Sequence, residues 1–282
     1  MNSNEQMGTE GEHDAPGESS RRSFLTKAAV GGAVAWSIPT VLSSPASAQG
    51  TAPLPPLLTV QNDRLSAAGT ANVGGLGNTG ANGQVLYVMV PVIAGVDTIV
   101  VTPSAGTGPP WVPIITGYAS TGNIPGTSTP PATAGSPARI ILFVWGRVGA
   151  ITDTSVSVTL AGGTLPAGGR WRAGVAEFSG VGFIADGVGE GLALGSNGLT
   201  STMITSPAIT TNNNAWSVFI GGADAALGSP TTPAGYLQFD SNNFIPEHMI
   251  AGLGFVPGPI PAATSTLTAA AHTVAALITV EG

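Results

Sequence analysis

The chain has no cysteine and very little charge. Of its 282 residues only 8 are lysine or arginine and 15 are aspartate or glutamate, which gives a net charge of −7. The absence of cysteine excludes a disulfide scaffold and a thiolate-ligated zinc or iron–sulfur site. The scarcity of basic residues argues against a nucleic-acid partner, and the low content of Glu, Lys and Arg excludes a coiled coil.

Glycine, proline and apolar residues are abundant instead. The chain has 41 glycines and 23 prolines, and 43 % of its residues are hydrophobic. This apolar content is sufficient to build a core. Because turn-forming residues separate many short apolar runs, the composition favours a turn-rich, all-β protein.

The first 48 residues have the layout of an export signal. A polar stretch (1–20) precedes, in order, the pair Arg21-Arg22, Phe24-Leu25, an apolar run over 28–42, and the small residues Ala46 and Ala48. This order resembles a bacterial twin-arginine (Tat) signal peptide with its cleavage site. The apolar run is too short to anchor as a spanning helix, which needs about 20 apolar residues. The resemblance implies cleavage after Ala48 and export of a folded protein that is secreted or associated with the cell envelope, without a membrane span.

The segment after the signal is poor in charge as well. It has five arginines, ten acidic residues and no lysine. Residues 49–60 contain Pro53, Pro55 and Pro56 and are predicted to form an extended, proline-rich linker. Residues 61–282 are predicted to form a single domain.

Short apolar runs bounded by turn residues predict many strands in this domain. They cover residues 85–90, 98–101, 140–145, 154–160, 173–178, 216–220, 249–253, 265–267 and 273–280. No segment of the domain has a sustained helical period. Strands of this length and spacing predict a jelly-roll-like antiparallel β-sandwich.

The domain also contains a weak internal similarity. Residues 156–160 followed by 172–180 resemble 265–268 followed by 272–278, and 97–101 leading to Pro110-Trp111 resemble 216–220 leading to 233–236. One interpretation is a duplication into two half-repeats, each of which supplies one sheet of a single sandwich. The other is that glycine- and threonine-rich β-sequences resemble one another in general.

The order of these segments resembles a loosely defined group of domains in bacterial exported proteins and in bacteriophage tail or virion proteins. The resemblance lies in residues 97–101, Pro110-Trp111, 142–145, 155–160 and 173–181. It implies a jelly-roll-like sandwich with a surface or adhesion role. It brings no catalytic residues with it.

Signals for catalysis and metal binding are sparse. His248 and His272 are the histidines after the signal, and neither has a spacing that places two imidazoles on one metal ion. A nucleophile elbow is absent from the sequence, so we lean towards a non-enzymatic protein, with a triad assembled only in space left open. Calcium would favour the clustered oxygens of 212–214 and 240–243, but turn formation explains both runs, and we predict no cofactor.

Aromatic and acidic residues suggest one binding site. Trp111 and Trp171 lie near predicted loop ends and are expected to be exposed, with Tyr118 and Tyr236 beside them, whereas Trp145 and Trp216 lie within apolar strands and are expected in the core. Asp186 and Glu190 form the best-placed acidic pair for a glycosidase, although a solvated glycine-rich loop explains them better.

Two functional hypotheses follow. The first is an exported, non-enzymatic β-sandwich protein that binds or assembles at the cell surface or outside the cell. The second is a carbohydrate-active protein, either a sugar-binding module or a glycoside hydrolase. The corresponding partners are another surface protein or a cell-envelope polysaccharide.

Overall fold

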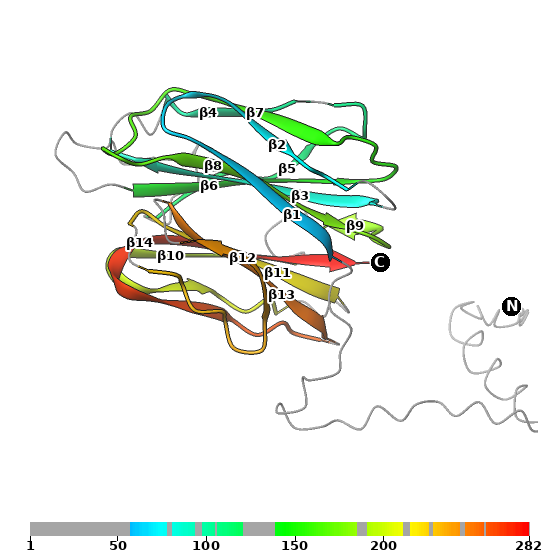
Figure 1. The fold of residues 1–282 in the computed structure, drawn as a ribbon. Coiled ribbons are helices and arrows are strands. Elements are labelled where there is room, and N and C mark those ends of the chain that lie inside the picture. Colours follow the sequence, from blue (N-terminus) through cyan, green and yellow to red (C-terminus); the bar gives the residue numbers. More distant parts are fainter. Residues whose placement is uncertain are drawn as a thin grey trace, which may run out of the picture. The chain divides into compact units, whose positions relative to one another are not determined.

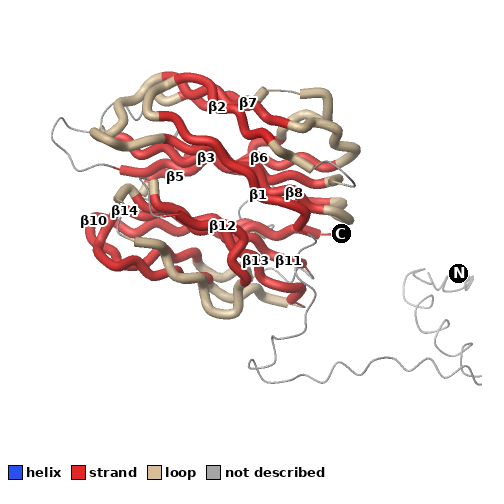
Figure 2. The backbone as a smooth tube through the Cα atoms, viewed as in Figure 1, coloured by secondary structure: helices blue, strands red, loops and turns tan. Residues whose placement is uncertain are grey.

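The computed structural model shows a chain built from antiparallel strands. It describes residues 57–77, 81–93, 98–104, 106–120, 139–184, 191–210, 215–225, 228–242, 246–256 and 258–281. These residues form strands joined by loops, with no α-helix among them (Figure 2). The predicted all-β sandwich is therefore confirmed. No helix in the described part of the chain is long and apolar enough to cross a membrane.

Residues 57–178 form two packed sheets, which we call the N-terminal roll. Its strands are β1 (Leu57–Leu65), β2 (Gly69–Gly74), β3 (Gly83–Val92), β4 (Val100–Pro103), β5 (Val112–Ala119), β6 (Arg139–Val148), β7 (Ser155–Ala161) and β8 (Trp171–Phe178). The inner sheet has the order β1-β8-β3-β6-β5 and the outer sheet the order β2-β7-β4 (Figure 1). The first strand pairs with the eighth, the second with the seventh and the third with the sixth. This nested pairing is that of a jelly roll, except that β5 pairs with β6 at the edge of the inner sheet.

Residues 192–281 form a second roll, the C-terminal roll. Its strands are β10 (Leu192–Ser206), β11 (Ala215–Ala223), β12 (Leu237–Asn242), β13 (Glu247–Val256) and β14 (Ala263–Glu281), and the short β9 (Phe183–Ile184) pairs with the end of β14. The sheet order is β10-β14-β11-β13-β12. Numbered along the chain, the five inner-sheet strands of each roll follow the same order, 1-5-2-4-3. The shared order is what an internal duplication would produce.

The long strands β10 and β14 serve two layers of the C-terminal roll. Residues 192–197 pair with 273–278, and beyond a shift in register residues 203–206 pair with 263–266. The second part of β10 folds back over the first, since the carbonyl of Thr205 leaves no room for a side chain at Gly195. Thr231 donates its backbone N–H to Thr266 and so lies beside β14 as β4 lies beside β7.

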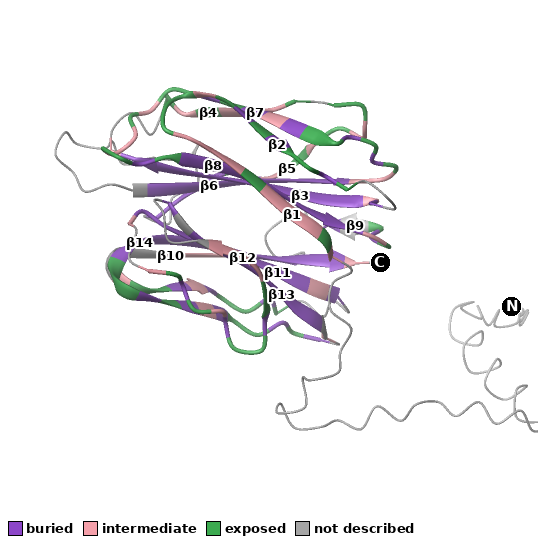
Figure 3. Cartoon of the chain, in the orientation of Figure 1, coloured by how far each residue is buried: buried purple, intermediate pink, exposed green. Residues whose placement is uncertain are grey.

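Three apolar cores result from this arrangement. One lies inside the N-terminal roll and one inside the C-terminal roll, while the third lies between the two inner sheets (Figure 3). Strand β3 is buried on both faces: Tyr87 and Met89 face the core between the rolls, and Leu86 and Val88 face the N-terminal core. The expectation that each half supplies only one sheet of a single sandwich is therefore wrong, because each half closes around its own core.

The internal similarity is explained in part by this topology. Residues 156–160 and 172–178 lie in β7 and β8, and their counterparts 265–268 and 272–278 lie in the two parts of β14, at equivalent positions of the two rolls. The other proposed pair is not equivalent. Residues 100–103 form β4 of an outer sheet, whereas 216–220 lie in β11 of an inner sheet.

The boundary predicted for the linker is also wrong. Residues 57–60, assigned to the proline-rich linker, belong to β1, which pairs with β8 from Leu57 onward. Each of the nine predicted strand segments overlaps a strand. The predicted signal residues Arg21, Arg22, Ala46 and Ala48 lie outside the described residues.

Candidate functional sites

Three of the aromatic residues expected at the surface are buried. Trp171 has no exposed surface, and its Nε1 donates a hydrogen bond to the carbonyl of Ala67 at 2.8 Å. Trp171 begins β8, and the alternation of that strand directs it into the N-terminal core. Tyr118 lies in the core between the rolls and Tyr236 in the C-terminal core, where burial raises the pKa of the Tyr236 hydroxyl to about 12. The expected exposure of these three residues is wrong.

Trp111 is half-buried and supports an arginine instead of offering a free face. The guanidinium of Arg147 lies 4.2 Å from the centre of the Trp111 ring. Arg147 forms an ion pair with Asp153 at 2.7 Å, and its Nε donates to Gln84, whose amide donates in turn to Glu177. Burial raises the pKa of Asp153, but hydrogen bonds from Thr107 and the charge of Arg147 outweigh it and lower that pKa to about 2. Trp111 is thus part of a buried polar chain.

Of the six residues proposed for a sugar site, the four that the structure describes are not brought together. Trp111 and Trp171 pack in the N-terminal core, while Tyr118 and Tyr236 lie in two other cores. Asp186 and Glu190 lie outside the described residues. Trp145 is in the core as predicted, and Trp216 is half-buried.

The two histidines each pair with an aspartate. His272 Nδ1 lies 2.7 Å from Asp224 Oδ2 within the C-terminal roll, and the His272 backbone N–H donates to the same carboxylate. His272 is buried. His248 is the second residue of β13 and faces the core between the two rolls, with no exposed surface.

His248 belongs to a polar cluster between the rolls, which we call the junction cluster. Its Nε2 lies 2.8 Å from Asp240 Oδ2 and 3.3 Å from Arg172 Nη1. Arg172 Nη1 also donates to Asn62, and the Asn62 amide donates to Asp240. Tyr87 completes the cluster, with its ring 6.2 Å from that of His248. Strands β1, β3 and β8 of one roll and β12 and β13 of the other thus contribute to it.

Burial and charge determine the protonation of this cluster. Burial lowers the pKa of His248, and although the hydrogen bond to Asp240 raises it, Arg172 lowers it further. Burial raises the pKa of Asp240, but the hydrogen bond and charge of His248 and the charge of Arg172 bring it below its ordinary value. Burial lowers the pKa of Arg172 to about 10, and burial raises that of Tyr87. At neutral pH Arg172 and Asp240 are therefore charged, and His248 and Tyr87 are neutral.

Little in the sequence indicated the junction cluster. Its only signal is Arg172, a charged residue in the strand β8, all of whose residues are buried. Asp240 was assigned to a turn together with its neighbours, but residues 240–242 lie in β12, which corrects that interpretation. The other run considered for calcium, 212–214, lies outside the described residues. Within the described part of the chain, no group of three or more histidine or acidic residues is arranged to hold a metal ion.

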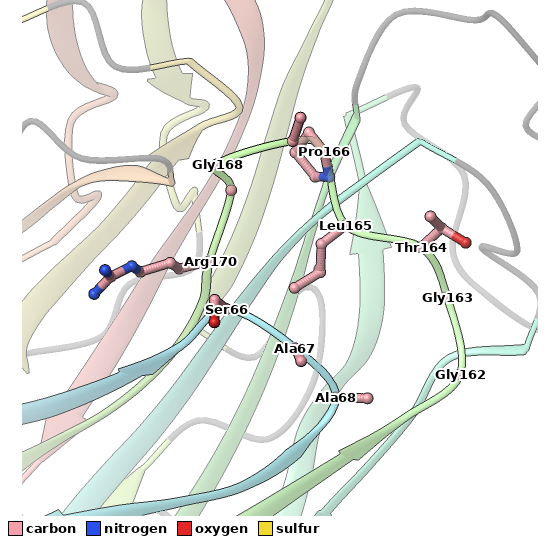
Figure 4. Close-up of a pocket in the computed structure, with 12 residues that line it drawn as sticks. Ser66, Ala67, Ala68, Gly162, Gly163, Thr164, Leu165, Pro166, Gly168 and Arg170 are labelled. Atoms are coloured by element: carbon pink, nitrogen blue, oxygen red, sulfur yellow. The ribbon is translucent and has the colours of Figure 1, made fainter.

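Two hollows open on the surface of the N-terminal roll. The larger, of about 500 Å³, lies between the β1–β2 loop and the β7–β8 loop. Leu165 points into it, and the side chain of Arg170 extends away from the other lining residues (Figure 4). The smaller, of about 350 Å³, is an apolar groove beside β5, lined mainly by Pro109, Pro110, Val112, Ile114, Val148 and Ile184.

The exposed large hydrophobic side chains have a common location. Leu58, Val100, Val112, Met203 and Leu237 are each at least 43 % exposed. They lie on β1, β4, β5, β10 and β12, and each of these strands is at the edge of its sheet. An edge strand carries unpaired backbone groups along one side, although the backbone N–H and carbonyl of Met203 are bonded by Ser201 and Thr273.

The fold and these sites define an all-β protein of two jelly rolls joined through their inner sheets. Comparison of the chain with family models, with curated proteins and with solved structures finds no match.

Proposed function

We propose that the chain is an exported, non-enzymatic protein that works by binding or assembly at the cell surface or outside the cell, through the open edges of its sheets. The observation that supports this most is the position of the five exposed large hydrophobic side chains of the described residues, all on edge strands. Natural proteins commonly protect such edges with charge, lysine above all. This chain has no lysine after Lys27.

The edges differ in the contact that they offer. β5 contains Pro113, and its pairing with β6 shifts register twice, so it is poorly suited to adding a regular strand. The apolar groove beside Val112 favours the packing of a partner's side chains there instead. β12 contains no proline and carries Leu237 at its start, and this edge suits backbone pairing.

Charge on the edges tests the proposal. Val112→Lys and Leu237→Lys, singly and together, place a lysine on each edge, and Thr159→Lys places the same charge on β7, the central strand of an outer sheet. Sedimentation velocity of the secreted protein over a concentration series should show association of the wild type and of Thr159→Lys. The dissociation constant for self-association should be at least about tenfold higher in the edge variants.

The result that would overturn the proposal is association that is equal in all variants, or a wild type that neither self-associates nor binds the producing cell's surface. A glycan array run on the same proteins tests the alternative, a carbohydrate-active protein. Saturable sugar binding that the edge variants retain would favour a carbohydrate-binding protein over assembly through edges.

A further inference from the structure

The junction cluster contains polar groups that its hydrogen bonds do not use. Among the described residues, Arg172 Nε and Nη2, Tyr87 Oη and His248 Nδ1 are buried and have no hydrogen-bond partner. Leaving a buried polar group unpaired costs about 1–3 kcal/mol. Four such atoms within one cluster are available to hydrogen-bond a polar guest.

The unused edge of Arg172 defines the shape of this guest. Nε and Nη2 donate in parallel from one side of the planar guanidinium, whereas Nη1 is engaged by Asn62. Two parallel N–H groups match the two oxygens of a carboxylate, which makes this the strongest pairing that an arginine forms.

Tyr87 contributes a third donor close to Arg172. The Tyr87 ring lies directly over Gly174, with its hydroxyl above the position where a Cβ would stand. Gly174 and Arg172 are two residues apart on β8 and therefore face the same side of the sheet.

The charge around the cluster also favours an anion. Arg64 on β1 is directly opposite Arg172 in the antiparallel register, so two guanidinium groups occupy neighbouring positions on one face. Asp240 is the carboxylate that faces them from β12, while Tyr87 and His248 face them from β3 and β13. Beyond the effect of burial, the positive charges of Arg172 and Arg64 both lower the pKa of His248, so the potential in the cluster is positive on the side of β1 and β8.

We propose that the junction between the two rolls is a binding site for a small carboxylate, held on the free edge of Arg172 and by the Tyr87 hydroxyl, with uptake of one proton by His248. His248 Nε2–H donates to Asp240 in both states. When the carboxylate is bound, Nδ1 gains a proton and becomes a fourth donor. Asn62 is exposed and Asp240 is one-quarter exposed, so the site is reached along the rim between β1 and β12. This inference does not depend on the proposed assembly.

The proton uptake gives the site a distinctive pH dependence. Free His248 is neutral near pH 7, because burial and the neighbouring Arg172 keep its pKa low. If one proton enters with each carboxylate, the affinity rises by up to about tenfold for each pH unit between 7.5 and 6.5. A carboxylate bound at a simple arginine surface shows no such dependence in this range.

Formate and acetate are the probes, titrated calorimetrically into the full-length protein at pH 7.5 and 6.5 in buffers of different ionisation enthalpy. Chloride at equal ionic strength is the reference. A tripeptide with a free C-terminal carboxylate is titrated in parallel, because that group has the same chemistry. We expect saturable binding of formate, acetate or the tripeptide, uptake of about one proton, and tighter binding at the lower pH.

Variants assign the effect to the cluster. Tyr87→Phe keeps the ring over Gly174 and removes only the hydroxyl, so it should weaken binding at least fivefold, and His248→Gln should abolish the proton uptake. Arg170→Gln alters an exposed arginine two residues from Arg172 and should bind like the wild type. Equal effects of carboxylates and chloride would overturn the proposal and leave buried water as the guest. Binding that Tyr87→Phe and His248→Gln retain unchanged would overturn it as well.

Discussion

The ring of Tyr87 lies flat against Gly174 of the neighbouring strand, so closely that no side chain fits at position 174. The contact lies within the inner sheet of the N-terminal roll, on the face that packs against the C-terminal roll. Gly174 does not have a positive φ, so a substitution there tests packing alone.

Gly174→Ala should lower the free energy of unfolding by about 1–3 kcal/mol, because the added methyl group displaces the Tyr87 ring. Urea unfolding followed by tryptophan fluorescence measures this. Gly74→Ala is the matched control, since a Cβ at that strand position meets no atom within 4 Å. A similar loss in both variants would mean that strand propensity, and not the Tyr87 contact, sets the cost.

Arg147→Met should destabilise the protein by about 3 kcal/mol or more, because it leaves the buried Asp153 without its ion-pair partner. It also removes the donor to Gln84 and the cation above Trp111. Guanidinium unfolding at pH 7 gives the value. Arg170→Met changes an exposed arginine and should remain within about 0.5 kcal/mol of the wild type. If the two variants are equally stable, the hydrogen-bonded chain of Arg147, Gln84 and Glu177 contributes nothing to the stability of the fold.

Asp153 should contribute to acid lability. Its pKa is lowered from an ordinary 3.8 to about 2 in the folded protein, so the unfolded chain binds more protons between these values. The contribution of Asp153 to stability is therefore complete above pH 3.8 and is lost as the pH falls towards 2. Asp153→Asn should show a shallower decline of melting temperature over this interval, measured by calorimetry. An unchanged slope would contradict the assignment.

His248 should affect stability at a higher pH. Its pKa in the folded protein lies below the ordinary 6.5, so below pH 6.5 the unfolded chain takes up a proton that the folded chain does not. The contribution of neutral His248 to the free energy of unfolding is then complete above pH 6.5. It declines as the pH falls, by at most about 1.4 kcal/mol per pH unit. In chloride buffers without carboxylate, His248→Gln should remove this part of the slope. If the variant keeps the slope, another group is responsible.

Trp171→Phe should loosen the β1–β2 loop without affecting any ligand. It removes the hydrogen bond from Trp171 Nε1 to the carbonyl of the exposed Ala67, which contributes about 0.5–1.5 kcal/mol to stability. Hydrogen exchange at residues 66–68 should accelerate, while Trp145→Phe in the same core should leave that loop protected. Loss of sugar binding in a folded Trp171→Phe variant would contradict the structural role assigned here.

Local patterns in the sequence predicted the fold class well. The alternation of residues 154–160 and the apolar run 140–145 are properties of single strands, and β7 and β6 lie where these patterns predict them. Strands with weaker patterns were missed. β10 and β12 contain many serines, threonines and asparagines, and only their pairing with β14 and β13 makes them strands.

The candidate site could not be predicted in the same way. Arg172 is distant in the chain from Asp240 and His248, and it meets them only because the inner sheets of the two rolls pack face to face. Trp171 was assigned to the surface because it lies near a predicted loop end. It begins β8 instead, and the alternation of that strand determined its burial.

The nested pairing of strands has a consequence for how the chain folds. Leu57 pairs with Phe178, and Leu192 pairs with Ile278, so neither roll can close before its final strand has been synthesised. Such long-range closure carries a large loop-entropy cost and makes folding slow. Unpaired strand edges are then exposed for a long time, which is when chains aggregate. A chain with this kinetic weakness is better served by crossing a membrane after folding than before it, and that is the order of events implied by the twin-arginine resemblance of residues 20–48.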